Sequence, residues 1–224
     1  FMESVHAKSY STIFFFLFNN RKIEEIFDWT HSNETLQYKA KRINDIYQNG
    51  TPLQKKIASV FLESFLFYSG FYTPLWYLGN NLLPNVAEII KLIIRDESVH
   101  GTYLGYKFQL GYNQLDEDEQ AEIRDWMYEL LYDLMENELL YTEEVYDQIG
   151  WTNEVKTFVK YNANKALQNL GFEPFFPDAS AEQVNPIVMN GLSTDTTNHD
   201  FFSQVGSGYL MGNVEAMDDD DYDF

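Results

Sequence analysis

The sequence contains two copies of one short pattern, Glu-x-x-His, at Glu3–His6 and Glu97–His100. In a helix, positions i and i+3 lie about 60° apart around the axis and about one turn along it, so both side chains of a copy can address one point beside the helix. Carboxylate oxygens and neutral imidazole suit iron or manganese. One copy is weak evidence, but two copies in a helical bundle, with carboxylates from two further helices, are typical of a dinuclear metal site.

A third carboxylate, Glu63, lies in the strongly apolar stretch ASVFLESFLFY. A buried and unpaired carboxylate is costly, and metal ligation removes that cost. We therefore expect Glu63 to be a further ligand. The alternative is a glutamate that forms a hydrogen bond with a tyrosine or serine. The sequence shows no clear fourth carboxylate.

Tyr10 lies four residues after His6, on the helix face that carries Glu3 and His6. A tyrosine beside a metal pair is a redox partner, a hydrogen-bond donor or simply part of the core. Because the chain has 16 tyrosines, position alone favours the core.

The neighbours of the expected ligands are also informative. Phe67 and Phe71 follow Glu63 at helical spacing, and Ile93 precedes Glu97 by one turn, so apolar groups would line the site. Asp96 can accept a hydrogen bond from the second nitrogen of a metal-bound histidine. The alternative for Asp96 is a salt bridge to a nearby base.

The composition excludes several classes of protein. The 224 residues are 45% hydrophobic, and 15 basic against 35 acidic residues give a formal net charge of −20. Such a chain is a poor partner for nucleic acid. Without cysteine, it can form neither a thiolate metal site nor a redox dithiol. The apolar run at 13–18 is too short to span a bilayer, and no signal peptide is visible, so we expect a cytoplasmic protein that does not bind membranes.

The elements that must position these residues are helices, and the fold class is all-α. Capping residues, glycines and prolines predict a bundle within 1–171. The expected helices are 2–19, 34–48, 52–72 with a break or kink at Pro74, 84–108 ending near Gly111, 116–149 and 152–170.

The residues after Gly171 have a different composition. Prolines and glycines recur, and 172–224 holds eleven acidic residues and no basic one. We expect a flexible acidic tail. Its simplest interpretation is a solubility tail, and the alternative is a docking segment.

These features together resemble the small, radical-generating subunit of class I ribonucleotide reductase. The strings ESVHAKSYS, LESFLFYSGF, RDESVHGTYLGYKFQ and GSGYLMGNVEAMDDDDYDF are most similar to the manganese/iron class Ib branch. The resemblance covers essentially the whole chain and implies a ferritin-like bundle. It also implies an upstream aspartate ligand and an upstream tryptophan, so the chain is expected to be N-terminally truncated, with about the first third missing, and to assemble poorly alone.

The resemblance implies a role for each candidate residue. Tyr10 would hold the stable tyrosyl radical, within the apolar pocket of Phe67, Phe71 and Ile93. Asp96 and Tyr209 would transfer the radical towards the large subunit. The ligands of the dinuclear manganese or iron centre would be Glu3, His6, Glu63, Glu97 and His100.

The resemblance also implies partners. The large catalytic subunit would bind the end of the tail, and a second copy of the chain would form a homodimer. In class Ib, a flavodoxin-like activator would supply superoxide. The docking residues would be Asp218, Asp219, Asp220, Asp221, Tyr222, Asp223 and Phe224.

Two other functions remain open from the residues alone. One is a ferritin-like di-iron oxidase or ferroxidase, which needs neither a radical tyrosine nor a docking tail. The other is a non-catalytic helical protein whose tail binds a basic partner. Only radical generation uses both the metal cluster and the tail.

Overall fold

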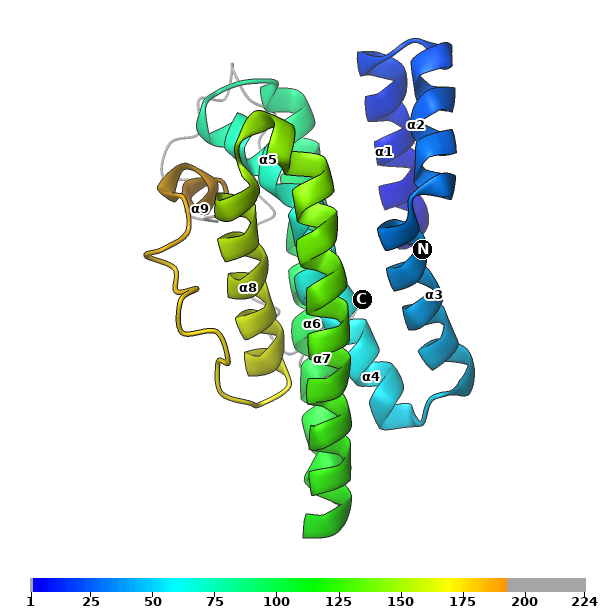
Figure 1. Cartoon of the computed structure of the whole chain (residues 1–224), viewed down its shortest axis with the longest axis vertical. Helices are drawn as coiled ribbons and strands as arrows, with labels where there is room; N and C mark the ends of the chain where they lie inside the picture. Colours follow the sequence, from blue (N-terminus) through cyan, green and yellow to red (C-terminus); the bar gives the residue numbers. More distant parts are fainter. Residues whose placement is uncertain (1, 193–224) are drawn as a thin grey trace, which may run out of the picture.

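The computed structural model describes residues 2–192, and within them the chain is helical and has no strand (Figure 1). The all-α prediction is therefore confirmed. No described helix is both long and apolar enough to cross a membrane. The elements are α1 (Met2–Leu17), α2 (Asn20–Ser32), α3 (Glu34–Asn49), α4 (Pro52–Phe61), the π-helix η1 (Leu62–Leu66), α5 (Tyr68–Gly79), α6 (Pro84–Tyr112), α7 (Glu117–Tyr146), the 3₁₀ turn η2 (Asp147–Ile149), α8 (Thr152–Asn169) and α9 (Pro186–Leu192).

Local sequence chemistry sets many of the helix ends. The side chains of Asn33, Thr51 and Asp116 each accept a hydrogen bond from the backbone N–H three residues later, which satisfies a donor that the first helical turn leaves free. Gly150 and Gly171 have φ values of 74° and 86°, a region that favours glycine. The three capping side chains begin their helices, and the two glycines follow the ends of theirs, near the positions that the sequence predicts.

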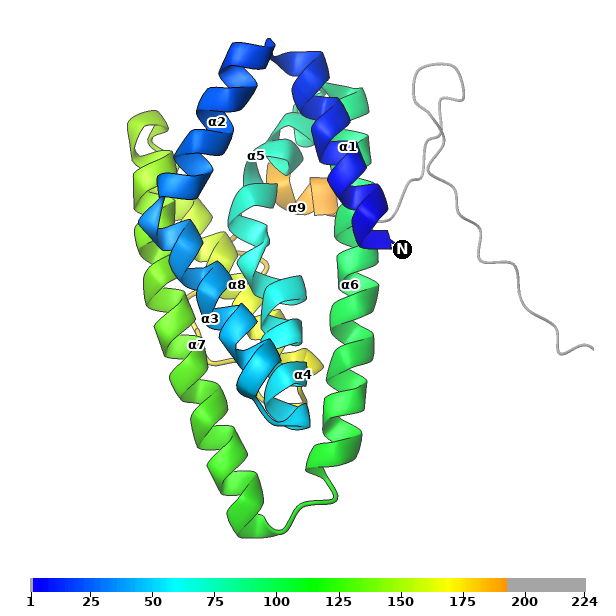
Figure 2. The same cartoon turned by 90° about the vertical axis from the view of Figure 1, so that its right-hand side faces the viewer.

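One interrupted helical rod occupies the middle of the bundle. It consists of α4, η1 and α5, which contact α6 and α8. Figure 2 shows α6 and α7 diverging from their short connection, with α4 and α8 between them. The helix α3 packs on α4 and α7, while α1 and α2 form a hairpin beside α6 and α3. The rod and α6 share a core that includes Phe61, Phe65, Tyr72 and Phe108.

Two features of the helices differ from the sequence prediction. Residues 20–32, for which no helix is predicted, form α2, and this helix carries the exposed His31. Pro74 lies inside α5 and does not end it. The interruption of the rod lies earlier, at η1. It is therefore a change of hydrogen-bonding pattern around Glu63 and not a proline break.

The segment 172–192 also differs from the expected tail, because it packs on the bundle. The Asn164 side chain accepts hydrogen bonds from the backbone N–H groups of Phe175 and Phe176 and donates one to the carbonyl of Phe176. The helix α9 packs against α5 and buries Val188. Packing on the bundle thus continues beyond Gly171, at least to Leu192. Tyr209, His199 and the docking residues lie outside the described residues.

Glycines bring α6 close to its neighbours. A Cβ at Gly105 would lie 2.2 Å from the backbone oxygen of Asn169, and one at Gly101 would lie 2.1 Å from Ser64 Oγ. Asn169 also donates a hydrogen bond to Ser64 Oγ at 3.1 Å. The backbones of α6 and α8 are therefore in direct contact at Gly105.

Candidate metal centre

Three helical elements bring the five expected ligands together. Glu3 and His6 come from α1, Glu63 from η1, and Glu97 and His100 from α6. Their potential ligand atoms form two groups, in each of which the atoms lie within 4.8 Å of one another. The first group is Glu3, His6 and Glu97; the second is Glu63, Glu97 and His100.

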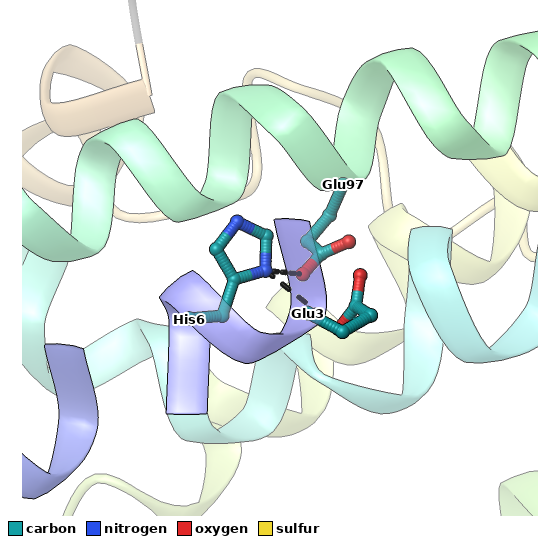
Figure 3. Close-up of side chains that lie close together, drawn as sticks. All are labelled: Glu3, His6 and Glu97. Carbon is teal, nitrogen blue, oxygen red and sulfur yellow. Dashed lines mark ion pairs between the residues drawn. The ribbon is translucent and has the colours of Figure 1, made fainter. Parts of the chain in front are cut away.

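Glu97 belongs to both groups. Its Oε1 lies 3.1 Å from His6 Nδ1, and its Oε2 lies 3.1 Å from His100 Nδ1. Figure 3 shows its carboxylate pointing from α6 towards His6 and Glu3 on α1. Only 2% of the residue is exposed. A single buried carboxylate thus faces two imidazoles with its two oxygens, one in each group of potential ligands.

The other two carboxylates lie at slightly greater distances. Glu3 places one oxygen 3.7 Å from His6 Nδ1 and the other 3.8 Å from His100 Nδ1. Glu63 Oε2 lies 3.7 Å from His100 Nδ1. Glu3 is largely exposed whereas Glu63 is mostly buried. The site therefore opens to solvent on the side of α1.

Asp96 orients the imidazole of His6. Asp96 Oδ2 lies 3.2 Å from His6 Nε2, on the side of the ring opposite the glutamates. With Nδ1 directed at the carboxylates, Nε2–H donates to Asp96, which fixes the tautomer that leaves Nδ1 free to bind a cation. The structure therefore places Asp96 where a hydrogen-bond partner of a ligating histidine should lie.

Replacement of Asp96 by alanine is expected to weaken metal binding by about 10- to 100-fold, because the orienting hydrogen bond is lost. Asp96→Asn keeps an oxygen acceptor, so its metal affinity should fall less than that of the alanine variant. Titration of the metal-free protein with Mn²⁺ measures both effects. Equal affinity in the alanine variant and the wild-type protein would contradict a role for Asp96 in orienting His6.

The donor set fits a pair of divalent cations. His6 Nδ1 and Glu63 Oε2 are buried without a hydrogen-bond partner, although buried polar atoms are normally paired. Burial, followed by the contact with Glu97 and the negative charges of Glu97 and Glu3, raises the pKa of Glu63 to about 9. Two imidazoles and three carboxylates that converge in this way suit manganese or iron, and a bound cation would replace the proton on Glu63.

The metal-free protein is expected to lose stability as the pH rises. In the unfolded chain Glu63 titrates near 4.5, and in the folded chain near 9. Between these two pH values the folded state binds one more proton than the unfolded state. The contribution of Glu63 to the free energy of unfolding is therefore complete below about pH 4.5 and is lost as the pH approaches 9. Urea unfolding at pH 5.5, 7 and 8.5 measures this slope. Glu63→Gln should flatten it, and an equal slope in that variant would contradict the assignment.

Tyr10 lies next to this cluster on a shared cavity. The cavity has a volume of about 650 Å³ and is lined by Tyr10, Phe67 and Phe71, together with His6 and Glu97. Burial, with the negative charges of Glu97 and Glu3, raises the pKa of Tyr10 to about 12. The phenol is therefore protonated at neutral pH.

The expected apolar pocket is only partly reproduced at this cavity. Phe67 and Phe71 contact each other there, with ring centroids 6.2 Å apart. Ile93 is buried in the same core on α6, but it does not line the cavity. The role of these three residues around Tyr10 stays a prediction.

Sequence reasoning missed one buried ion pair at this cavity. Lys39 on α3 and Ser69 on α5 line it, and both contact Glu138, which is fully buried on α7. A signal was present, because Glu138 shares a helical stripe with the buried residues Leu134 and Thr142. The π-helical geometry of η1 has no comparable signal, since its residues also suit an ordinary helix.

The comparison with known families is decisive here, because the model of "Ribonucleotide reductase, small chain" matches residues 1–186. The chain belongs to this family. It is 50% identical over 225 residues to "Ribonucleoside-diphosphate reductase subunit beta" of Mycobacterium leprae, covering 100% of this chain and 69% of the relative. It is also 50% identical over 231 residues to the protein of that name from Bacillus subtilis, covering 99% of this chain and 68% of the relative. The chain thus spans about two thirds of these relatives' length.

A solved structure supports the same fold. The dimanganese(II)-NrdF of Streptococcus sanguinis is 70% identical, with a TM-score of 0.84 over 86% of this chain and 68% of that one. A putative class I ribonucleotide reductase from Bacillus halodurans is 25% identical, with a TM-score of 0.72 over 81% of this chain and 68% of that one. The predicted all-α, ferritin-like bundle is therefore confirmed.

Proposed function

We propose that the chain is the radical-generating small subunit of a ribonucleoside-diphosphate reductase, with Glu3, His6, Glu63, Glu97 and His100 as ligands of a dinuclear manganese or iron centre. The observation that carries the proposal is the position of Glu97, which faces both histidines and lies on the same cavity as the partly buried Tyr10. Family membership supplies the reaction, in which the small subunit acts together with a large subunit.

In this proposal the five ligands hold the metal pair, and Tyr10 is the electron donor. When bound, the pair supplies the oxidising equivalent that removes one electron from a phenol. Tyr10 keeps its phenolic proton at neutral pH because its pKa is raised to about 12, so its oxidation releases a proton together with the electron. Asp96 holds His6 through Nε2 and leaves Nδ1 for the centre. Phe67 and Phe71 provide apolar walls on the cavity that Tyr10 lines.

The partners follow from the chemistry that this chain lacks. Nucleotide reduction needs thiols, and the chain has no cysteine, so the large subunit must provide them. Tyr209 would relay the radical, and the acidic C-terminal residues would dock on that subunit. The likeness to a dimanganese(II) protein supports the class Ib branch. We further propose a flavodoxin-like activator, a homodimer and a cytoplasmic location.

The test is electron paramagnetic resonance of the metal-loaded and oxidised protein, followed by a nucleotide-reduction assay with the large subunit. A tyrosyl signal that disappears during turnover is the expected result. An oxidised metal pair with no organic radical would replace the proposal with the oxidase alternative. Absence of tight metal binding in a full-length protein that includes the implied upstream aspartate would exclude both.

A further inference from the structure

A buried ion pair joins α3 to α7 beside the metal centre. Lys39 Nζ lies 2.9 Å from Glu138 Oε2 and 3.2 Å from Glu138 Oε1. Glu138 is completely buried, and 16% of the Lys39 side chain is exposed. The ammonium group also lies 4.5 Å from the centre of the Tyr141 ring. Burial of two charges gives little net stability, so the contacts of this pair with neighbouring segments matter more than its own energy.

Both members of the pair contact the chain immediately after Glu63. Lys39 Nζ donates to the carbonyl of Leu66 at 3.4 Å, and Leu66 is the last residue of η1. Ser69 Oγ donates to Glu138 Oε1. The ion pair is therefore hydrogen-bonded on both sides of the junction between η1, which carries Glu63, and α5.

Tyr146 on α7 contacts the same junction. Its hydroxyl donates to the carbonyl of Ser69 at 2.6 Å and accepts a hydrogen bond from Thr73 Oγ1 at 3.2 Å. Three side chains from α3 and α7 thus contact the short stretch between Leu66 and Thr73.

This stretch needs support from outside its own helix. A π-helix is rare and uses a less favourable hydrogen-bonding pattern than an α-helix. One turn later, Pro74 has no N–H, so the carbonyl of Gly70 lacks its usual helical donor. A change of η1 to α-helical bonding would shift the register by one residue, or about 100° around the axis. Glu63 would then turn away from Glu97 and His100.

We propose that Lys39, Glu138 and Tyr146 are positioning residues that hold η1 in its π-helical form, so that Glu63 faces Glu97 and His100. They act through the backbone after Glu63 and do not touch the ligand atoms. The link to metal binding rests on the function proposed above, whereas the effect on the backbone of η1 does not.

The test compares two double variants of the protein. Lys39→Met with Glu138→Gln removes both buried charges together, so that neither is left unpaired. Arg42→Met with Asp133→Asn is the matched control, because this ion pair also joins α3 to α7, at 2.9 Å, without contacting η1 or α5. The first measurement is hydrogen exchange of the amides of residues 62–71 in the metal-free protein. The second is titration with Mn²⁺.

The Lys39/Glu138 variant should exchange these amides at least about tenfold faster than the control and should lose tight binding of one of two Mn²⁺ ions. Equal exchange in the two variants would overturn the proposal. If the wild-type protein itself fails to bind two ions, the proposed function fails, and the exchange result still decides the positioning role.

A milder pair of substitutions covers the case in which the charge variant does not fold. Ser69→Ala with Tyr146→Phe removes three of the hydrogen bonds at the junction and leaves the ion pair intact. It should accelerate exchange in the same residues by a smaller factor. Unchanged exchange in this variant would overturn the proposal for Tyr146. Lys39→Arg, which keeps the charge, should exchange the same amides as slowly as the wild-type protein.

Discussion

Replacement of Glu97 by alanine is expected to remove both metal ions, whereas replacement of Glu3 or Glu63 should weaken chiefly one. Glu97 is the residue common to the two ligand groups, with one oxygen 3.1 Å from each histidine nitrogen. In the proposed centre, its loss would remove a potential ligand from each of the two groups, together with one negative charge. We expect no tightly bound metal and no nucleotide reduction.

Metal analysis after gel filtration checks this expectation, with stoichiometry per chain as the measured quantity. Glu88→Ala is a matched control, because Glu88 is also on α6 and has a buried, unpartnered Oε2, yet belongs to neither group. This control should retain both ions. One tightly held ion in the Glu97 variant would show that the two groups bind independently and that Glu97 is not a bridge.

Replacement of Tyr10 by phenylalanine should leave metal binding intact and abolish the tyrosyl signal. The change removes only the phenolic oxygen, so the ring still packs against the core. Without the phenolic O–H, the side chain at this position cannot lose an electron and a proton to form a tyrosyl radical. Nucleotide reduction should therefore fall by at least about a thousandfold, the order expected when an obligatory catalytic group is removed.

Paramagnetic resonance and metal analysis on the same sample separate the two effects. Tyr141→Phe is the control, since Tyr141 lines the same cavity from α7 and its pKa is also raised by burial. That variant should keep the radical signal. A full signal in the Tyr10 variant would transfer the radical to another residue and contradict the role proposed for Tyr10.

The ligand pairs were predictable because their geometry is local. In Glu3–His6 and Glu97–His100, helical periodicity alone places both side chains on one face. The conclusion that Glu63 joins them required only that an isolated acidic residue in an apolar stretch must find a partner. The structure brings these five residues together, and their ligation stays a proposal.

The features that sequence reasoning missed depend on contacts between distant segments. Lys39 and Glu138 look like surface charges until α3 and α7 are placed beside α5. The segment 172–192 has the composition of a loop, but Asn164 fixes part of its backbone and α9 packs on α5. The π-helical form of η1 follows from its surroundings as well. In each case tertiary structure overrides a local propensity.

The contact at Gly105 has a consequence for the positions of Glu97 and His100. Gly105 lies eight residues after Glu97 on the continuous helix α6, a distance of about 12 Å. Because α6 and α8 touch there backbone to backbone, a side chain at this position would move α6 as a rod and carry Glu97 and His100 with it. Metal–ligand distances tolerate only about 0.2 Å. A substitution at Gly105 is therefore expected to displace Glu97 and His100, although Gly105 lies more than one turn away from either residue.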